Sequence, residues 1–250
     1  MESALGLSGY PLLWAALVVF AAAFIRGYSG FGFSAVLMAG LILQMPAVQI
    51  VPLSIALEVL ASAGQARGIF SSIDWRLLTT LLLTGIFGTP IGVYLLGVLP
   101  EAPIRVSVQI FILLASLILI FSRERINPAP LILFALVGFV AGVVNGATAL
   151  SGLVLALFFM LSGIQAAVMR ATMIAYFFVT DLWTGGLLVA TGLFEIQTVF
   201  RVAAALPLLG FGVWIGSKKF VSTNPASFRL YVLLLLLGLS SVGLLGMVLG

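Results

Sequence analysis

The sequence predicts an all-α protein that crosses a membrane several times, as a bundle of transmembrane helices built from two inverted repeats. Three observations support this prediction. The chain has too few charged residues to cover a water-soluble surface. Its apolar segments recur in the same order in both halves, and each half begins with a long apolar stretch that small and polar residues interrupt.

The composition identifies lipid as the main solvent of the chain. Of its 250 residues, 63% are hydrophobic and 7% are charged, and the mean hydropathy is +1.32. A soluble domain carries roughly 25% charged residues, so this chain lacks the means to form a soluble surface. Its length suits about eight to ten membrane segments of about 20 residues each. The Lys and Arg residues are scattered between apolar runs, so we interpret them as determinants of topology and expect no nucleic-acid partner.

Two repeats are predicted, residues 1–126 and residues 127–250, divided at a polar connector that contains two prolines. In each repeat, a broken apolar stretch precedes three further apolar segments. The segments of the first repeat are 12–45, 48–66, 77–99 and 104–121. Those of the second repeat are 131–161, 166–190, 199–216 and 230–249. Because the order is shared, we expect the two halves to fold alike.

The distribution of basic residues predicts that the second repeat is inverted relative to the first. As one helix, the stretch 12–45 would be roughly 50 Å long, which exceeds a hydrocarbon core of about 30 Å, so we expect it to turn back. Each repeat then crosses the membrane an odd number of times, and eight of ten loop cations lie on one side. Without the turn these cations divide evenly, against the positive-inside rule. We therefore expect a multi-pass inner-membrane protein with both termini periplasmic. The segments that flank each break can either span the membrane or re-enter it.

The break in the first repeat, at residues 26–33, is a candidate anion site. Three glycines lie within six residues here, and freed backbone amides at membrane depth are tolerated only where protein buries them or where they line a polar cavity. We expect a helix to restart near Ser29 and to direct its positive N-terminal end into the protein, where the adjacent arginine adds a full charge. The candidate substrate-binding residues of this break are Arg26, Gly27, Ser29, Gly30 and Gly32.

The break in the second repeat, at residues 145–152, offers an amide and two hydroxyl groups at matching positions. Transporters with inverted repeats bind substrate near the midplane of the membrane, between their broken helices. The glycines of both breaks can instead serve only close helix packing, and this alternative stays open at this point. The candidate substrate-binding residues are Asn145, Gly146, Thr148 and Ser151.

Two acidic residues, Glu58 and Asp181, lie near the middle of matching apolar segments. Acids inside a membrane are costly and usually face a cavity or a partner, so both are candidates for proton coupling. A structural role is the alternative. Each acid can pair with Arg26 or Arg170, or stay neutral and hydrogen-bonded.

These features favour a secondary transporter of a small anion, with a passive anion channel as the alternative, because both classes use inverted repeats and broken helices. The central acids favour coupled transport. We expect no enzyme, because the chain has no His, no Cys and no close pair of acids. For the same reason we expect no metal and no cofactor. The partners expected are the anionic substrate and the lipid bilayer. The oligomeric state stays open, and a homodimer is one option.

Four short motifs follow one another in an order found in one family of transporters. They are GYSGFGF at 27–33, ARG at 66–68, SIDWR at 72–76 and GTPIG at 88–92. In these residues, and in its two similar halves, the chain resembles the TauE/SafE sulfite exporter family. The second break departs from the family pattern, since it has Ala149 and Leu150 where members are richer in glycine. The resemblance implies export of sulfite or organosulfonates, with an ion gradient as one driving force.

Overall fold

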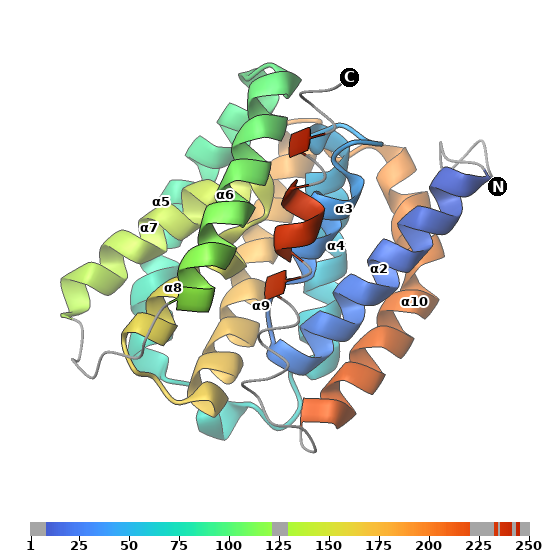
Figure 1. The fold of residues 1–250 in the computed structure, drawn as a ribbon. Coiled ribbons are helices and arrows are strands. Elements are labelled where there is room, and N and C mark those ends of the chain that lie inside the picture. Colours follow the sequence, from blue (N-terminus) through green and yellow to red (C-terminus); the bar gives the residue numbers. More distant parts are fainter. Residues whose placement is uncertain (1–8, 122–129, 221–232, 235, 242–243, 246–250) are drawn as a thin grey trace.

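The computed structural model describes residues 9–121, 130–220, 233–234, 236–241 and 244–245, and within these residues the regular structure is entirely helical (Figure 1). The prediction of an all-α fold is therefore confirmed. The helices of the first half are α2 (Tyr10–Ser29), α3 (Phe33–Leu41), α4 (Ala47–Gln65), the short 3₁₀ helix η1 (Phe70–Ser72), α5 (Trp75–Val98) and α6 (Glu101–Phe121). Those of the second half are α7 (Leu131–Thr148), α8 (Ser151–Leu161), α9 (Ala166–Ala190) and α10 (Ile196–Phe220).

Seven helices in the described part of the chain are long and apolar enough to cross a membrane, namely α2, α4, α5, α6, α7, α9 and α10. Helices α3 and α8, with 9 and 11 residues, are too short to span a bilayer of ordinary thickness. Half of the predicted segment 230–249 lies outside the described residues. The chain is thus a multi-pass membrane protein in which each broken stretch contains one long and one short helix.

Both predicted breaks exist, but each is shorter than predicted. Helix α2 continues through Ser29, where the Gly30 amide still donates to the Arg26 carbonyl at 2.9 Å, and α3 begins only at Phe33. The prediction of a helix that restarts near Ser29 is wrong by four residues. Between the two helices, Gly30 and Gly32 have φ values of 80° and 90°, which glycine adopts without a steric penalty.

The second break repeats this turn with a different residue. Helix α7 ends at Thr148, and Ala149 follows with a φ of 59° before α8 begins at Ser151. Ala149 is the one non-glycine residue with positive φ in the described part of the chain. Its amide donates to the Asn145 carbonyl at 2.8 Å, as the amide of Gly30 donates to the Arg26 carbonyl at 2.9 Å. The two α-helices therefore end in the same geometry.

Close helix contacts hold the broken stretches in place. Helix α2 packs on α10 and helix α7 packs on α5, while α4 and α9 pack on each other. A Cβ added to Gly216 would lie 3.0 Å from the Cα of Gly27, and one added to Gly92 would lie 2.9 Å from the Cα of Gly146. Small residues allow such approach in lipid, where dispersion contacts drive helix association. Gly27 and Gly146 thus pack helices in this structure, which is the alternative that the sequence left open.

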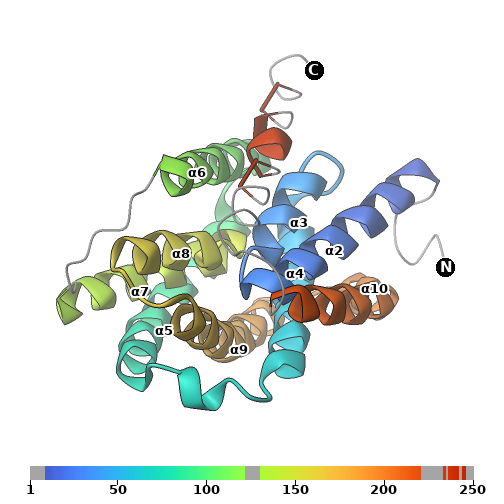
Figure 2. The ribbon, with the colours of Figure 1, turned by 60° about the horizontal axis from the view of Figure 1, so that its bottom comes forward.

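The directions of the helices fit an inverted arrangement. In Figure 1, α2 runs downward from the upper right, whereas α7 rises from the lower left. Figure 2, turned so that the lower end comes forward, shows α4, α9 and α10 side by side at this end. The repeats 1–126 and 127–250, and their orientation across a membrane, stay predictions.

The glycine contacts give a test with a matched control. Gly92→Ala should lower the free energy of unfolding by about 1–3 kcal/mol, because its Cβ would overlap the backbone of α7. Gly210→Ala, in the interior of α10, should be neutral or slightly stabilising, because nothing lies within 4 Å of its added Cβ. Thermal unfolding of the two variants in detergent measures the difference. Equal effects would show that the α5–α7 contact is not tight.

Candidate functional site

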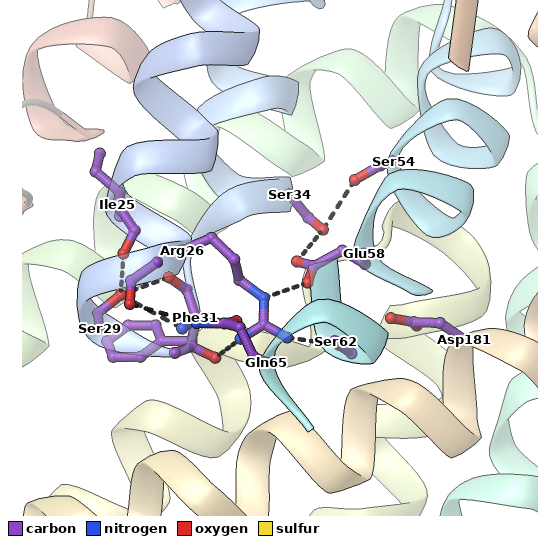
Figure 3. Close-up of polar contacts among 12 residues, drawn as sticks. Ile25, Arg26, Ser29, Phe31, Ser34, Ser54, Glu58, Ser62, Gln65 and Asp181 are labelled. Carbon is purple, nitrogen blue, oxygen red and sulfur yellow. Dashed lines mark hydrogen bonds and ion pairs between the residues drawn. The ribbon is translucent and has the colours of Figure 1, made fainter. Parts of the chain in front are cut away.

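A buried ion pair lies beside the first break (Figure 3). Arg26, in the last turn of α2, is 0% exposed, and its Nε donates to Glu58 Oε2 of α4 at 2.7 Å. Its Nη2 donates to Ser62 Oγ at 2.7 Å, and its Nη1 donates to the Gly30 carbonyl inside the break. The Phe177 ring of α9 lies 5.0 Å from the guanidinium carbon. Each nitrogen of this guanidinium therefore has a partner, and Arg26 joins α2, the break and α4.

The second carboxylate oxygen of Glu58 connects the ion pair to helix α3. Ser34, in the first turn of α3, donates to Glu58 Oε1 at 3.0 Å, and Ser54 donates to Ser34 Oγ at 2.8 Å. We call Arg26, Ser34, Ser54, Glu58 and Ser62 the arginine cluster. All of its members are buried. A change in the charge of Glu58 would therefore change the hydrogen bond that it accepts from Ser34 at the start of α3.

A second buried cluster occupies the matching place in the other half. Asn145 Nδ2 donates to Asp181 Oδ1 at 2.8 Å and to Thr184 Oγ1 at 3.0 Å, and Ser151 Oγ donates to Asn145 Oδ1 at 2.7 Å. We call these four residues the asparagine cluster. Asn145 follows Arg26 by 119 positions and Asp181 follows Glu58 by 123. The two clusters correspond in position but not in charge, since a neutral amide stands where the first half has a guanidinium.

A small cavity lies between the starts of α3 and α8, with about 10 Å³ of space for the centre of a water molecule, so in this conformation it has room for about one water. From the first half it is lined by Gly32, Ser34, Ala35 and Glu58, and from the second half by Ala149, Leu150, Gly152 and Leu153. The first amides of a helix lack acceptors within it and carry partial positive charge. Two helix N-termini thus face one cavity, and Glu58 stands between this cavity and Arg26. The arrangement suits a small anion.

The predicted site residues divide into those near this cavity and those that serve their own helices. Gly32 and Glu58 line the cavity, and Gly30 bonds Arg26. Thr148 Oγ1 donates to the Val144 carbonyl of its own helix at 2.8 Å. Ser29 Oγ lies within hydrogen-bond distance of the Ile25 carbonyl in α2, and it accepts from the Phe31 amide inside the break at 3.3 Å. Asp181 points toward the arginine cluster from α9 (Figure 3). The structure therefore brings Arg26, Glu58, Asn145, Ser151 and Asp181 into the interior of the bundle near the two breaks.

Sequence reasoning missed Ser34 and the contact of Arg170 with the first break. Ser34 bonds Glu58, and its position directly after the glycine-rich motif was a signal for a first-turn hydroxyl. Arg170 Nη2 donates to the Gly27 carbonyl at 3.0 Å across 143 residues of sequence, and no local pattern reports such a contact.

These features define a multi-pass membrane protein with a buried charged site between two broken helices, which is the architecture of a transporter. A family model described as Sulfite exporter TauE/SafE matches residues 15–243. The chain therefore belongs to the TauE/SafE family of membrane transporters, as its motifs predicted. Neither the curated proteins nor the solved structures contain a match to it.

The ion pair predicts unequal effects of two similar substitutions. Glu58→Gln leaves the buried guanidinium without its counter-charge and should cost about 3–5 kcal/mol of stability. Asp181→Asn should cost less, because the hydrogen bond to Asp181 comes from the neutral Asn145. Unfolding in detergent measures both. Adding Arg26→Gln to Glu58→Gln should restore part of the lost stability. A double variant that is less stable than Glu58→Gln alone would contradict the pairing.

Proposed function

We propose that this protein is a secondary active transporter that exports a small sulfur-containing oxyanion, such as sulfite, a sulfonate or an organosulfonate, across the inner membrane together with a proton. The observation that carries the proposal is the buried Arg26–Glu58 pair, at 2.7 Å, beside a cavity between two helix N-termini. Membership of the family supports transport of such an anion.

Arg26 is the residue that would grip the anion. Its guanidinium presents a planar fork that fits either a carboxylate or two oxygens of an oxyanion. In the present structure Glu58 occupies part of this fork and also lines the cavity. A substrate between the starts of α3 and α8 would compete with Glu58 for Arg26 while it accepts hydrogen bonds from freed backbone amides.

This competition links the anion to a proton. A carboxylate that loses its guanidinium in a low-dielectric interior is costly to keep charged, so Glu58 would take up a proton when the anion binds. Anion and proton then move together. A divalent oxyanion with one proton carries net negative charge outward, and an inside-negative potential favours that movement by about 2.3 kcal/mol per charge per 100 mV. Asp181 is the second candidate for the proton carrier.

The basic residues support an orientation. Arg67 and Arg76 flank the connection from α4 to α5, Arg170 lies in the first turns of α9, and Lys218 lies near the end of α10. On the positive-inside rule, this end of the bundle faces the cytoplasm. The chain would then begin and end on the periplasmic side.

The anion site is tested by Arg26→Ala and Arg26→Lys in proteoliposomes. Arg26→Ala should lower the initial rate of sulfite transport at least about 100-fold, since a charged hydrogen-bond partner of the anion is lost. Arg26→Lys should recover part of the rate, because an ammonium keeps the charge but lacks the fork. Arg201→Ala is the control, because Arg201 bonds Gln49 at 2.9 Å and belongs to neither cluster. Normal transport by Arg26→Ala would show that Arg26 does not bind the transported anion.

The coupling is tested by Glu58→Gln, which keeps the shape of the side chain but releases no proton. A pH gradient across the liposome should drive uphill accumulation of substrate by the wild type and not by Glu58→Gln. Exchange of labelled for unlabelled substrate should persist in the variant protein that stays folded, although the substitution lowers its stability. Asp181→Asn is the parallel variant. If Asp181→Asn loses accumulation and Glu58→Gln does not, Asp181 is the proton carrier. If the wild type never accumulates substrate, the protein is a passive channel.

A further inference from the structure

A second, larger cavity opens at the end of the bundle that carries Arg67 and Arg170. Its volume is about 460 Å³, and it is lined by helices α4, α9 and α10 together with the loop that follows α4. We call it the basic vestibule. Its lining includes both of these arginines, and no acidic side chain of the described residues contributes to it. The arginine cluster, in contrast, contains Glu58 as a counter-charge for Arg26.

Three side-chain donors meet at the inner end of the basic vestibule. Gln65 Nε2, Arg170 Nη2 and Ser217 Oγ lie 3.3, 3.0 and 3.2 Å from one acceptor, the carbonyl oxygen of Gly27. The donors come from α4, α9 and α10, and all three residues line the vestibule. Three helices therefore aim a donor at the same point.

One carbonyl oxygen cannot use three donors fully, because it has two lone pairs. The Gly27 carbonyl lies in the last turn of α2, and the amide four residues on, that of Phe31, donates to Ser29 Oγ at 3.3 Å instead. The Gly27 carbonyl oxygen is therefore available to accept hydrogen bonds from the three side chains. Gln65 Nε2 also donates to Ser217 Oγ at 3.3 Å, so the three side chains and the carbonyl form one connected polar group on the wall of the vestibule. A ligand that brings oxygen acceptors can join this group, because amide and guanidinium nitrogens carry more than one hydrogen each.

We propose that Gln65, Arg170 and Ser217 form an outer binding site in the basic vestibule for the oxyanion head of the substrate. Sulfite and sulfonates carry three oxygens on sulfur, which suits three converging donors, one of which belongs to the guanidinium of Arg170. The apolar wall beside them, which includes Trp214 and Leu60, accommodates the organic part of an organosulfonate. Because Gly27 adjoins Arg26 in the chain, an anion held here lies next to the arginine cluster. The inference rests on the proposed function for the identity of the anion.

The sequence makes a direct electrostatic test practical, because the chain has no cysteine. Gly64 lines the basic vestibule, and a Cβ added there meets nothing within 4 Å, so Gly64→Cys introduces a single thiol without a clash. Its rates of modification by an anionic methanethiosulfonate (sulfonatoethyl) and by a cationic one (trimethylammonioethyl) are measured in detergent. Each rate is divided by the rate at which the same reagent modifies a small free thiol. The ratio of the normalised anionic rate to the normalised cationic rate then reports the charge in the vestibule.

The anionic reagent should be favoured in Gly64→Cys, and adding Arg170→Gln should lower the normalised ratio about fivefold, since one unit charge within about 8 Å acts oppositely on the two reagents. Arg201→Gln is the matched control and should leave the ratio unchanged, because Arg201 lies outside this cavity. Methanesulfonate should protect the thiol in the parent and lose this effect in Arg170→Gln. It replaces sulfite as the probe because sulfite itself cleaves the reagent.

Arg170→Lys separates charge from geometry. It should keep the normalised ratio but weaken protection by methanesulfonate, and in transport it should raise KM for the anion with little change in kcat. An unchanged ratio or undiminished protection in Arg170→Gln would overturn the outer site, whatever the transport result. If the labelling behaves as expected but wild-type liposomes move no sulfur oxyanion, the proposed function fails and the outer site stands as an anion site.

Discussion

The buried pair between Arg26 and Glu58 is the interaction on which the rest of this architecture depends. In a lipid-solvated bundle, a guanidinium that is 0% exposed needs a counter-charge and a full set of acceptors, and α2, α4 and the first break supply them together. The pair fixes the end of α2 against α4. In the proposed transport cycle, the substrate anion competes with Glu58 for the guanidinium of Arg26. On that proposal, the contact that stabilises the fold is also the one that transport must open.

The turns at the two breaks position this pair. Left-handed residues at Gly30 and Ala149 end α2 and α7, so that α3 and α8 begin inside the bundle and aim their N-termini at one cavity. The glycine contacts of α2 with α10 and of α5 with α7 hold the long helices at backbone distance. Because the long helices are held in place, the short inner helices α3 and α8 keep their orientation. Their backbone dipoles therefore stay aimed at the cavity at membrane depth, where protein must satisfy the freed backbone groups.

The two halves divide the chemistry unequally. The first half supplies a fixed positive charge and its acid, while the second supplies an acid beside an amide and hydroxyl groups. The basic vestibule adds charge on one side of the bundle only. Two halves with the same order of helices thus differ in charge, and on the proposed function this difference would give an anion a preferred side of approach.

The sequence by itself determined the membrane class, the long helices, the family and the place of both breaks, because hydropathy, length and glycine spacing are local properties of the chain. It also marked Arg26, Glu58, Asn145 and Asp181, since polar residues inside apolar segments stand out. Only the tertiary structure decided that Arg26 pairs with Glu58, that Gly27 and Gly146 pack helices, and that Gln65, Arg170 and Ser217 meet at one carbonyl. These contacts join residues 32 to 190 positions apart, and their distances depend on how helices pack, which no local pattern encodes.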